Sequence, residues 1–276
     1  MIKDVIVNLS TGRARSFAGQ YAISLAETFD AHLAGIAFAY DPILPPTLMG
    51  GIPPDFIEEQ RRETGAAARA AVAGFEEAAR RAGVSFGAQV LDGTVAGAAD
   101  LFGRIARRYD LAIVGQADPD GISVDELIAE TALFESGRPV LVVPYIQKDG
   151  IKLGRVMVCW DGSRSAARAA ADAMPLLARA TAVEVVTIAG ERGKDDQVPG
   201  ADIGHHLARH GLKIDVKRIA AGDVEIGNMI LSYAADCGAD LIVMGGYGHS
   251  RLREFVLGGV TRTIFSAMTL PVLMSH

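Results

Sequence analysis

The two halves of the chain repeat one pattern of apolar segments. Each half opens with a strand-like segment, contains another that ends at a glycine, and closes with a proline-led one. A repeat of this length implies that each half folds in the same way around its own core. We therefore expect two domains of one architecture, residues 1–147 and 148–276. The matched segments are 5–10 with 156–161, 110–115 with 240–245, and 138–143 with 270–275.

Strand-like and helix-like segments alternate between these landmarks, as a parallel sheet requires. The first helix of the second half, for example, has an apolar stripe at Ala166, Ala170, Ala173 and Leu177. Such alternation predicts right-handed crossovers and two doubly wound, five-stranded parallel sheets, an α/β fold of the Rossmann-like kind. In the second half we expect strands at 155–160, 183–189, 213–219, 240–245 and 271–274, and helices at 164–180, 199–210, 224–237 and 258–267.

The first half is longer than the second because of one insertion. A Pro- and Gly-rich segment, 41–54, is followed by a long predicted helix over 56–82. Both halves end in a proline-led apolar strand, 139–143 and 271–274. Exposed edge strands of this kind invite aggregation unless they are paired or covered. We therefore expect these two strands to pair with each other, so that the halves pack as a pseudo-twofold pair.

Glycines follow the apolar segment 239–244 in a layout that suits phosphate binding. Gly245, Gly248 and Gly258 lack the β-carbon that would keep backbone N–H groups away from an anion. The helix predicted over 258–267 would point the positive end of its dipole at the same place. Glycine-rich turns between a strand and a helix also occur for steric reasons alone, and spacing by itself does not separate the two explanations.

The glycine spacing resembles the motif of the universal stress protein family, in which Gly, two residues, Gly, nine residues and Gly precede a small hydroxyl residue. This chain has Gly259 where nucleotide-binding members usually have Ser or Thr. The missing hydroxyl removes a donor to phosphate that is worth about 1.5–3 kcal/mol, although the backbone N–H of Gly259 remains. The resemblance implies an adenine nucleotide alpha hydrolase-like fold that binds ATP, with or without Mg²⁺, in the second half.

Asp161 follows the first strand of the second half, where ligands of doubly wound sheets bind. The resemblance implies that Asp161 contacts the nucleoside and that the backbone of Ile188 binds adenine. The alternative for Asp161 is a helix cap, as Asp before Gly and Ser often provides. His249 is a candidate phosphate contact, with an exposed loop position as the alternative. The implied site consists of Asp161, Ile188, Met244, Gly245, Gly248, His249, Gly258, Gly259 and Val260.

The first half keeps the expected fold and loses this motif. Ser10 stands opposite Asp161, and Gly115 matches Gly245, but Asp118 stands opposite Gly248. Carboxylates there would repel a phosphate. We therefore expect one nucleotide per chain, in the second half. The carboxylates concerned are Asp118, Asp120, Asp125 and Glu126.

Charge and composition narrow the function further. The net charge of −6 argues against a nucleic-acid partner. Residues 1–147 carry 12 Lys and Arg against 19 Asp and Glu, whereas residues 148–276 carry 15 against 14, so the second half suits an anionic ligand better. We expect no membrane segment because no uncharged apolar run reaches about 18 residues. The first strand begins at once, so we expect no signal peptide and a cytoplasmic protein.

Several smaller features predict no additional site. Cys159 and Cys237 lack disulfide or metal spacing and are interpreted as small apolar residues. His206 and His210 have a spacing that can share a metal ion, but no third ligand is evident, so we interpret them as part of a solvated helix face and predict no metal site.

These observations predict a stress-response regulatory protein that binds ATP or a related adenine nucleotide. A member that binds no nucleotide and acts through assembly is one alternative. A slow ATP-hydrolysing enzyme is another, but the glycine loop has no Lys and we find no clear second carboxylate beside Asp161, so we assign no catalytic residue and expect at most a weak ATPase. A homodimer and an unidentified protein partner both remain open.

Overall fold

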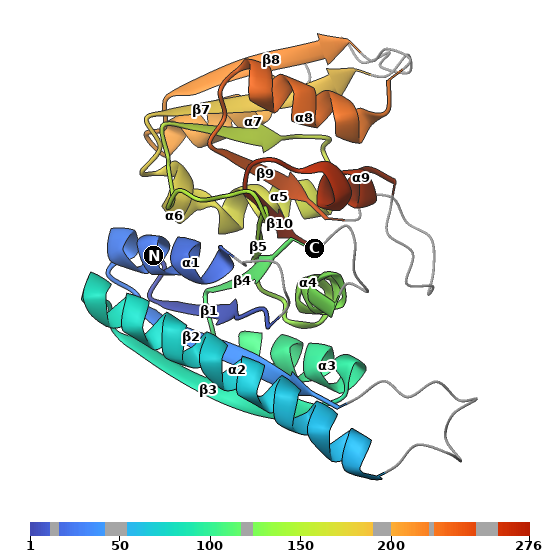
Figure 1. Cartoon of the computed structure of the whole chain (residues 1–276). Helices are drawn as coiled ribbons and strands as arrows, with labels where there is room; N and C mark the ends of the chain where they lie inside the picture. Colours follow the sequence, from blue (N-terminus) through green and yellow to red (C-terminus); the bar gives the residue numbers. More distant parts are fainter. Residues whose placement is uncertain (12–16, 42–53, 117–123, 190–199, 221–223, 247–258) are drawn as a thin grey trace.

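The computed structural model describes residues 1–11, 17–41, 54–116, 124–189, 200–220, 224–246 and 259–276. Its strands form one ten-stranded sheet in the order β3-β2-β1-β4-β5-β10-β9-β6-β7-β8. The first half therefore supplies one side of the sheet and the second half the other (Figure 1). The strands are β1 (Asp4–Asn8), β2 (His32–Tyr40), β3 (Phe86–Gly93), β4 (Leu111–Gly115), β5 (Val140–Val143), β6 (Arg155–Cys159), β7 (Ala182–Ala189), β8 (Ile214–Ala220), β9 (Leu241–Gly245) and β10 (Val272–Ser275).

Each half has the same strand order and the same register. Val5 of β1 pairs with Leu33 of β2, and Val156 of β6 pairs with Val183 of β7. All strand pairs within a half are parallel. The prediction of a doubly wound α/β fold is therefore confirmed.

The halves meet through one antiparallel strand pair. Leu141 in β5 lies opposite Leu273 in β10, flanked by Val142 with Val272 and Val140 with Met274. All residues of both strands are buried. The predicted pairing of the two proline-led strands is confirmed, and it converts two would-be edges into the centre of one sheet.

Helices cover both faces of the sheet (Figure 1), so its central strands are buried on both sides, whereas the edge strands β3 and β8 are largely exposed or half-buried. Along β9, Leu241 and Val243 belong to one apolar core, and Ile242 and Met244 belong to the other. Parallel strands covered on both faces read as continuous apolar runs, which explains why the sequence revealed them. The first core includes residues of α1 (Ala18–Phe29), α2 (Pro54–Ala82), α5 (Arg164–Asp172), α6 (Met174–Leu177) and α7 (Ala201–Arg209), and the second includes residues of α3 (Val95–Ala106), α4 (Val124–Glu135), α8 (Ile226–Asp236) and α9 (Gly259–Ala267).

The helix expected over 164–180 is divided in the structure. The helix α5 ends at Asp172, and α6 begins at Met174 with Pro175 in its first turn. Proline has no N–H and its ring clashes with the preceding turn, so it favours the start of a helix over the interior. The break lets Asp172 accept a hydrogen bond from Ser275 Oγ of β10 at 2.9 Å.

No helix in the described part of the chain combines the length and the apolar character needed to cross a membrane.

Candidate functional site

Three neighbouring strands of the second half end at the candidate site. The sheet order is β9-β6-β7, so β6 has a partner on each side and the chain leaves it towards β7. Ligands of doubly wound sheets bind at this switch point, beyond the carboxyl ends of the strands. Asp161, Ile188 and Gly245 lie at these three strand ends. Gly248, His249 and Gly258 lie outside the described residues.

Asp161 is exposed and belongs to the turn between β6 and α5. Its Oδ1 accepts a hydrogen bond from the backbone N of Ser163 at 2.9 Å. Ser163 is the residue that caps α5, because its Oγ accepts the N–H of Ala166 at 3.1 Å. Asp161 therefore stabilises the turn before the cap, and its exposed carboxylate lies where a ligand above β6 would pass.

Gly245 lies directly against the first turn of α5. A β-carbon at this position would come within 2.5 Å of the backbone N of Ala166 and within 2.6 Å of Ser165 Oγ. Because real side chains do not approach backbone atoms so closely, packing alone requires glycine here. This geometry supports the steric explanation at Gly245, whichever ligand the site accepts.

The side chains of Met244 and Ile188 are buried and half-buried, respectively. The side chain of Met244 is buried in the core beneath α9, so it points away from the strand ends. Ile188 is half-buried near the end of β7 and pairs with Ile219 of β8. The register matches Ile188 with Phe38 of the first half, because Val183 and Leu33 occupy equivalent places.

Gly259 and Val260 begin α9, and Gly259 is exposed. A β-carbon on Gly259 would find its nearest neighbour, Glu225 Oε1, at 3.8 Å, an ordinary contact distance. The same oxygen accepts a hydrogen bond from Thr263 Oγ1 at 2.5 Å. Since α9 has no acidic residue in its own first turn, Glu225 supplies the negative charge that its dipole favours.

Sequence reasoning missed the contact of Glu225 with α9. This residue is the N-cap of α8, and its partner Thr263 lies 38 positions away in the chain. The only signal in the sequence was an acidic residue close to the expected start of a helix. Such a signal does not reveal which other helix the side chain will contact.

In the first half, a half-buried carboxylate occupies the corresponding helix start. Asp125 lies in the first turn of α4 and accepts a hydrogen bond from Asn8 Nδ2 at 2.9 Å. Burial raises the pKa of Asp125 to about 6, while hydrogen bonds from Ser10 and Asn8 lower it. Burial also raises the pKa of Tyr40, and the charge of Asp125 adds to that effect.

Aromatic side chains occupy the rest of this first-half region. Phe38 is almost fully buried, and its ring centroid lies 6.1 Å from that of Tyr40. The equivalent place in the second half holds the smaller Ile188. The two halves thus share a backbone scaffold and differ in what stands at its strand ends. Asp118 and Asp120, which were expected to contribute here, lie outside the described residues.

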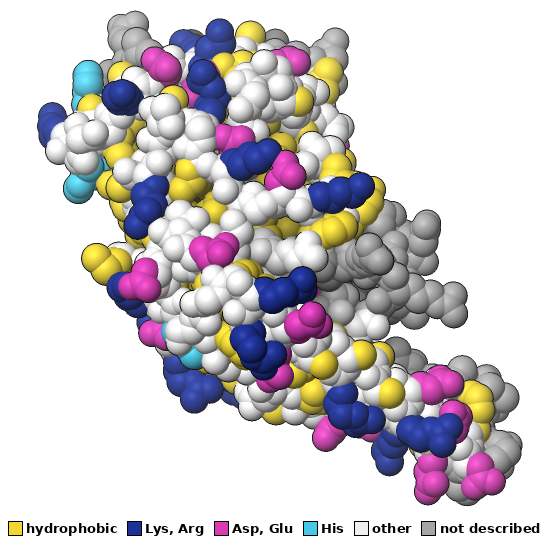
Figure 2. Space-filling view, turned by 60° about the vertical axis from the view of Figure 1, so that its left-hand side comes forward, with side chains coloured by type: hydrophobic (Ala, Val, Ile, Leu, Met, Phe, Trp, Pro, Cys, Tyr) yellow, Lys and Arg dark blue, Asp and Glu magenta, His cyan; other side chains and the backbone are white. Residues whose placement is uncertain are grey.

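Charged side chains of both signs are mixed on one face of the molecule. On the face shown in Figure 2, Lys and Arg are interspersed with Asp and Glu among the residues drawn in colour. Surfaces that bind nucleic acid usually gather basic residues on one face.

The histidines and cysteines form no recognised metal centre within the described residues. The rings of His206 and His210 lie 4.9 Å apart, centroid to centroid. Burial raises the pKa of the Cys159 thiol to about 12, with a smaller contribution from the charge of Asp161. A thiol with such a pKa is a poor nucleophile, as expected for an apolar role.

Comparison with known proteins identifies the second half most clearly. Residues 152–276 match the model of the universal stress protein family. A universal stress protein of Synechocystis is 31% identical over 146 residues, a stretch that covers 49% of this chain and 46% of that protein. The chain therefore spans about half the length of this curated relative.

Solved structures resemble the whole chain. A universal stress protein from Archaeoglobus fulgidus is 15% identical, with a TM-score of 0.70 over 98% of this chain and 94% of its own. A functionally unknown protein from Pseudomonas aeruginosa is 14% identical, with a TM-score of 0.56 over 99% and 92%. At these identities the likeness establishes the fold. A universal stress protein solved in complex with cAMP is 17% identical and covers 52% of this chain and 98% of its own, but its TM-score of 0.36 is too low to bear on this chain.

The packing of Gly245 predicts that Gly245→Ala destabilises the ligand-free protein. We expect a loss of about 1–3 kcal/mol in the free energy of unfolding, because the added methyl group would overlap the backbone of α5. Gly259→Ala is the matched control, since no atom of the described residues lies closer than 3.8 Å to its new methyl group. Urea denaturation measures both variants, and equal stability of the two would contradict this account.

The raised pKa of the Asp125 carboxyl group predicts a pH-dependent effect of Asp125→Asn. The folded-state pKa of about 6 exceeds the ordinary value of 3.8, so the native state binds this proton more tightly than the unfolded state does. The stability that Asp125 contributes is therefore present below about pH 4 and is lost as the pH rises through about 6.

We expect Asp125→Asn to be more stable than wild type at pH 8 by an amount on the order of 2–3 kcal/mol, and nearly equal to it at about pH 4. Urea denaturation at both pH values gives the difference. A variant that is less stable than wild type at pH 8 would show that the ionised carboxylate stabilises the fold.

Proposed function

Residues 152–276 belong to the universal stress protein family, and on this premise we propose that the chain is a stress-response regulatory protein that binds one adenine nucleotide. The nucleotide, ATP or a close relative with or without Mg²⁺, occupies the carboxyl ends of β6, β7 and β9. The main support is the contrast between two matching helix starts. The helix α4 begins beside the half-buried carboxylate of Asp125, whereas α9 begins at the exposed Gly259, where added atoms would have room among the described residues.

Each part of the nucleotide has a proposed partner. The exposed carboxylate of Asp161 accepts hydrogen bonds from ribose hydroxyls, and the backbone of Ile188 recognises the adenine edge. The N–H groups of Gly259 and Val260 hold the phosphates at the N-terminus of α9, where the helix dipole is favourable. Gly248, His249 and Gly258 complete this phosphate site on the basis of the sequence motif.

The second candidate function is assembly without a nucleotide. Glu225 favours it, because its carboxylate already lies beside the first turn of α9 and would repel a phosphate there. Nucleotide binding then requires Glu225 to be screened by a cation or to turn away. The affinity for ATP measured with and without Mg²⁺ separates screening of Glu225 from its turning away, since a cation that bridges Glu225 and a phosphate would raise this affinity.

One nucleotide per chain is the first expected outcome. Calorimetric titration with Mg-ATP should give a stoichiometry near one, because Asp125 in the first turn of α4 would repel a phosphate in the first half. Gly248→Asp should abolish the heat of binding by placing a carboxylate against the phosphates. Asp118→Gly, the reverse change in the first half, should leave the stoichiometry at one.

A stoichiometry near two would refute the assignment of a single site. No heat with wild-type protein would favour the assembly function instead. Unchanged affinity in Gly248→Asp would mean that the ligand does not use the glycine motif.

Gly259→Ser should strengthen nucleotide binding by up to ~1.5–3 kcal/mol, because it restores the hydroxyl donor that this chain lacks. The structure has room for the side chain, with Glu225 Oε1 3.8 Å from the new β-carbon. Gly259→Ala is the control for helix propensity, since it adds the methyl group without the donor. Dissociation constants measured by calorimetry should differ between the two variants. Equal constants would exclude a hydrogen bond from the added hydroxyl to a phosphate.

A further inference from the structure

Gln116 connects the first half to the helix proposed to hold the phosphates. It follows β4, is 6% exposed, and corresponds in the repeat to Gly246. The two equivalent positions act differently across the junction. A β-carbon on Gly246 would lie 2.7 Å from Leu133 Cδ2, so the glycine allows α4 to pack closely. Gln116 instead extends its side chain to α9.

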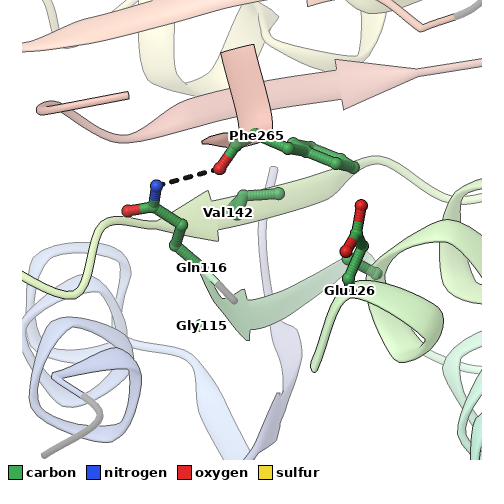
Figure 3. A pocket seen from close by; sticks show the side chains of 6 residues that line it. Gly115, Gln116, Glu126, Val142 and Phe265 are labelled. Atoms are coloured by element: carbon green, nitrogen blue, oxygen red, sulfur yellow. Dashed lines mark hydrogen bonds between the residues drawn. The ribbon is translucent and has the colours of Figure 1, made fainter. Parts of the chain in front are cut away.

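The amide of Gln116 forms hydrogen bonds at both of its polar atoms. Its Nε2 donates to the carbonyl oxygen of Phe265 at 2.9 Å, as Figure 3 shows, and its Oε1 accepts the N–H of Tyr145 at 3.3 Å. The bond to Phe265 is buried. A buried amide held on both sides has a defined orientation, so its donor is fixed relative to α9.

The carbonyl of Phe265 needs a donor from outside the helix. It lies in the last turn of α9, which ends at Ala267, and the last four carbonyls of an α-helix have no intrahelical partner. Gln116 therefore acts as a C-terminal cap supplied by the other half of the chain. No basic residue lies in the last turn of α9 to serve in its place.

This cap matters because α9 is short and its last turn borders a cavity. A helix of nine residues is marginal by itself and depends on tertiary contacts. The hydrogen bond between Thr263 and Glu225 holds the first turn to α8. At the other end, Phe265 faces a cavity (Figure 3) lined by Gly115, Gln116, Glu126, Ala129, Val142 and Phe265.

We propose that Gln116 is a positioning residue through which the first half sets the order of α9 and so the affinity of the second half for phosphate groups. The affinity part rests on the proposed function, whereas the ordering of α9 does not. If α9 is ordered for only a fraction of the time, the apparent affinity for a ligand at its N-terminus falls by that fraction. The first half, through Gln116, thus acts as a support for the site of the second.

Gln116→Met tests this proposal, because it keeps the length of the side chain and removes both polar atoms. Amides within 259–267 of the ligand-free variant should exchange hydrogen roughly fivefold to tenfold faster than in wild type. The dissociation constant for Mg-ATP should rise by a similar factor. Binding of adenosine, which has no phosphates, should stay unchanged. Gln116→Glu, which keeps the shape and lacks the donor, should behave in the same way.

Ser136→Ala is the matched control. Ser136 Oγ donates a hydrogen bond of 2.5 Å to the carbonyl of Ala132 near the end of α4. This bond caps the end of α4 in the first half, as Gln116 caps the end of α9 in the second. This variant should speed exchange in α4 and leave exchange in α9 and the affinity for Mg-ATP unchanged.

Unchanged exchange in α9 of both Gln116 variants would overturn the proposal, as would an equal loss of affinity for adenosine and Mg-ATP. If α9 exchanges faster in the variants but wild type binds no nucleotide, the ordering of α9 by Gln116 is upheld and the proposed function fails.

Discussion

The antiparallel pairing of β5 with β10 is the contact on which the rest of the structure depends. Three residue pairs, centred on Leu141 and Leu273, join two parallel sheets into one. Without this pairing, each half would expose an apolar strand edge to water and to other chains. Both strands are short and fully buried, so their register is fixed. This register fixes where α4 of the first half and α9 of the second half lie relative to the other half. The contacts of Gln116 with Phe265 and of Gly246 with Leu133 both follow from this geometry.

The sequence predicted the sheet well because each strand carries its own signal. Buried parallel strands appear as unbroken apolar runs, and the proline-led strands of the two halves indicated their own partners. Pro175 was equally visible, and the division between α5 and α6 could have been inferred from it. Contacts between distant segments had no such signal. That Gly245 needs to be glycine depends on how closely α5 approaches β9, and Asp125 accepts a hydrogen bond from Asn8, 117 positions away.

The candidate site shows how one scaffold can support two chemical environments. A helix N-terminus attracts negative charge, and the protein meets this tendency differently in its two halves. In the first half, Asp125 is half-buried and bonded to Asn8 at the start of α4. In the second half, Glu225 stands beside the first turn of α9 but is exposed, so the position remains accessible to solvent. The two carboxylates therefore differ in exposure. A dissolved anion can replace the exposed Glu225 at its helix start more readily than it can replace the half-buried Asp125.

The pairing of β5 with β10 inside one chain also removes a restriction that symmetry would impose. Two identical chains joined across a twofold axis present the same residue twice, so a position at their interface has to suit both copies. In this protein the equivalent positions are held by Gln116 and Gly246, one extending a side chain and the other making room for a helix. Joining the halves by a short segment also raises their effective concentration, so that their association does not depend on the amount of protein present. Each side of the interface can then change independently of the other.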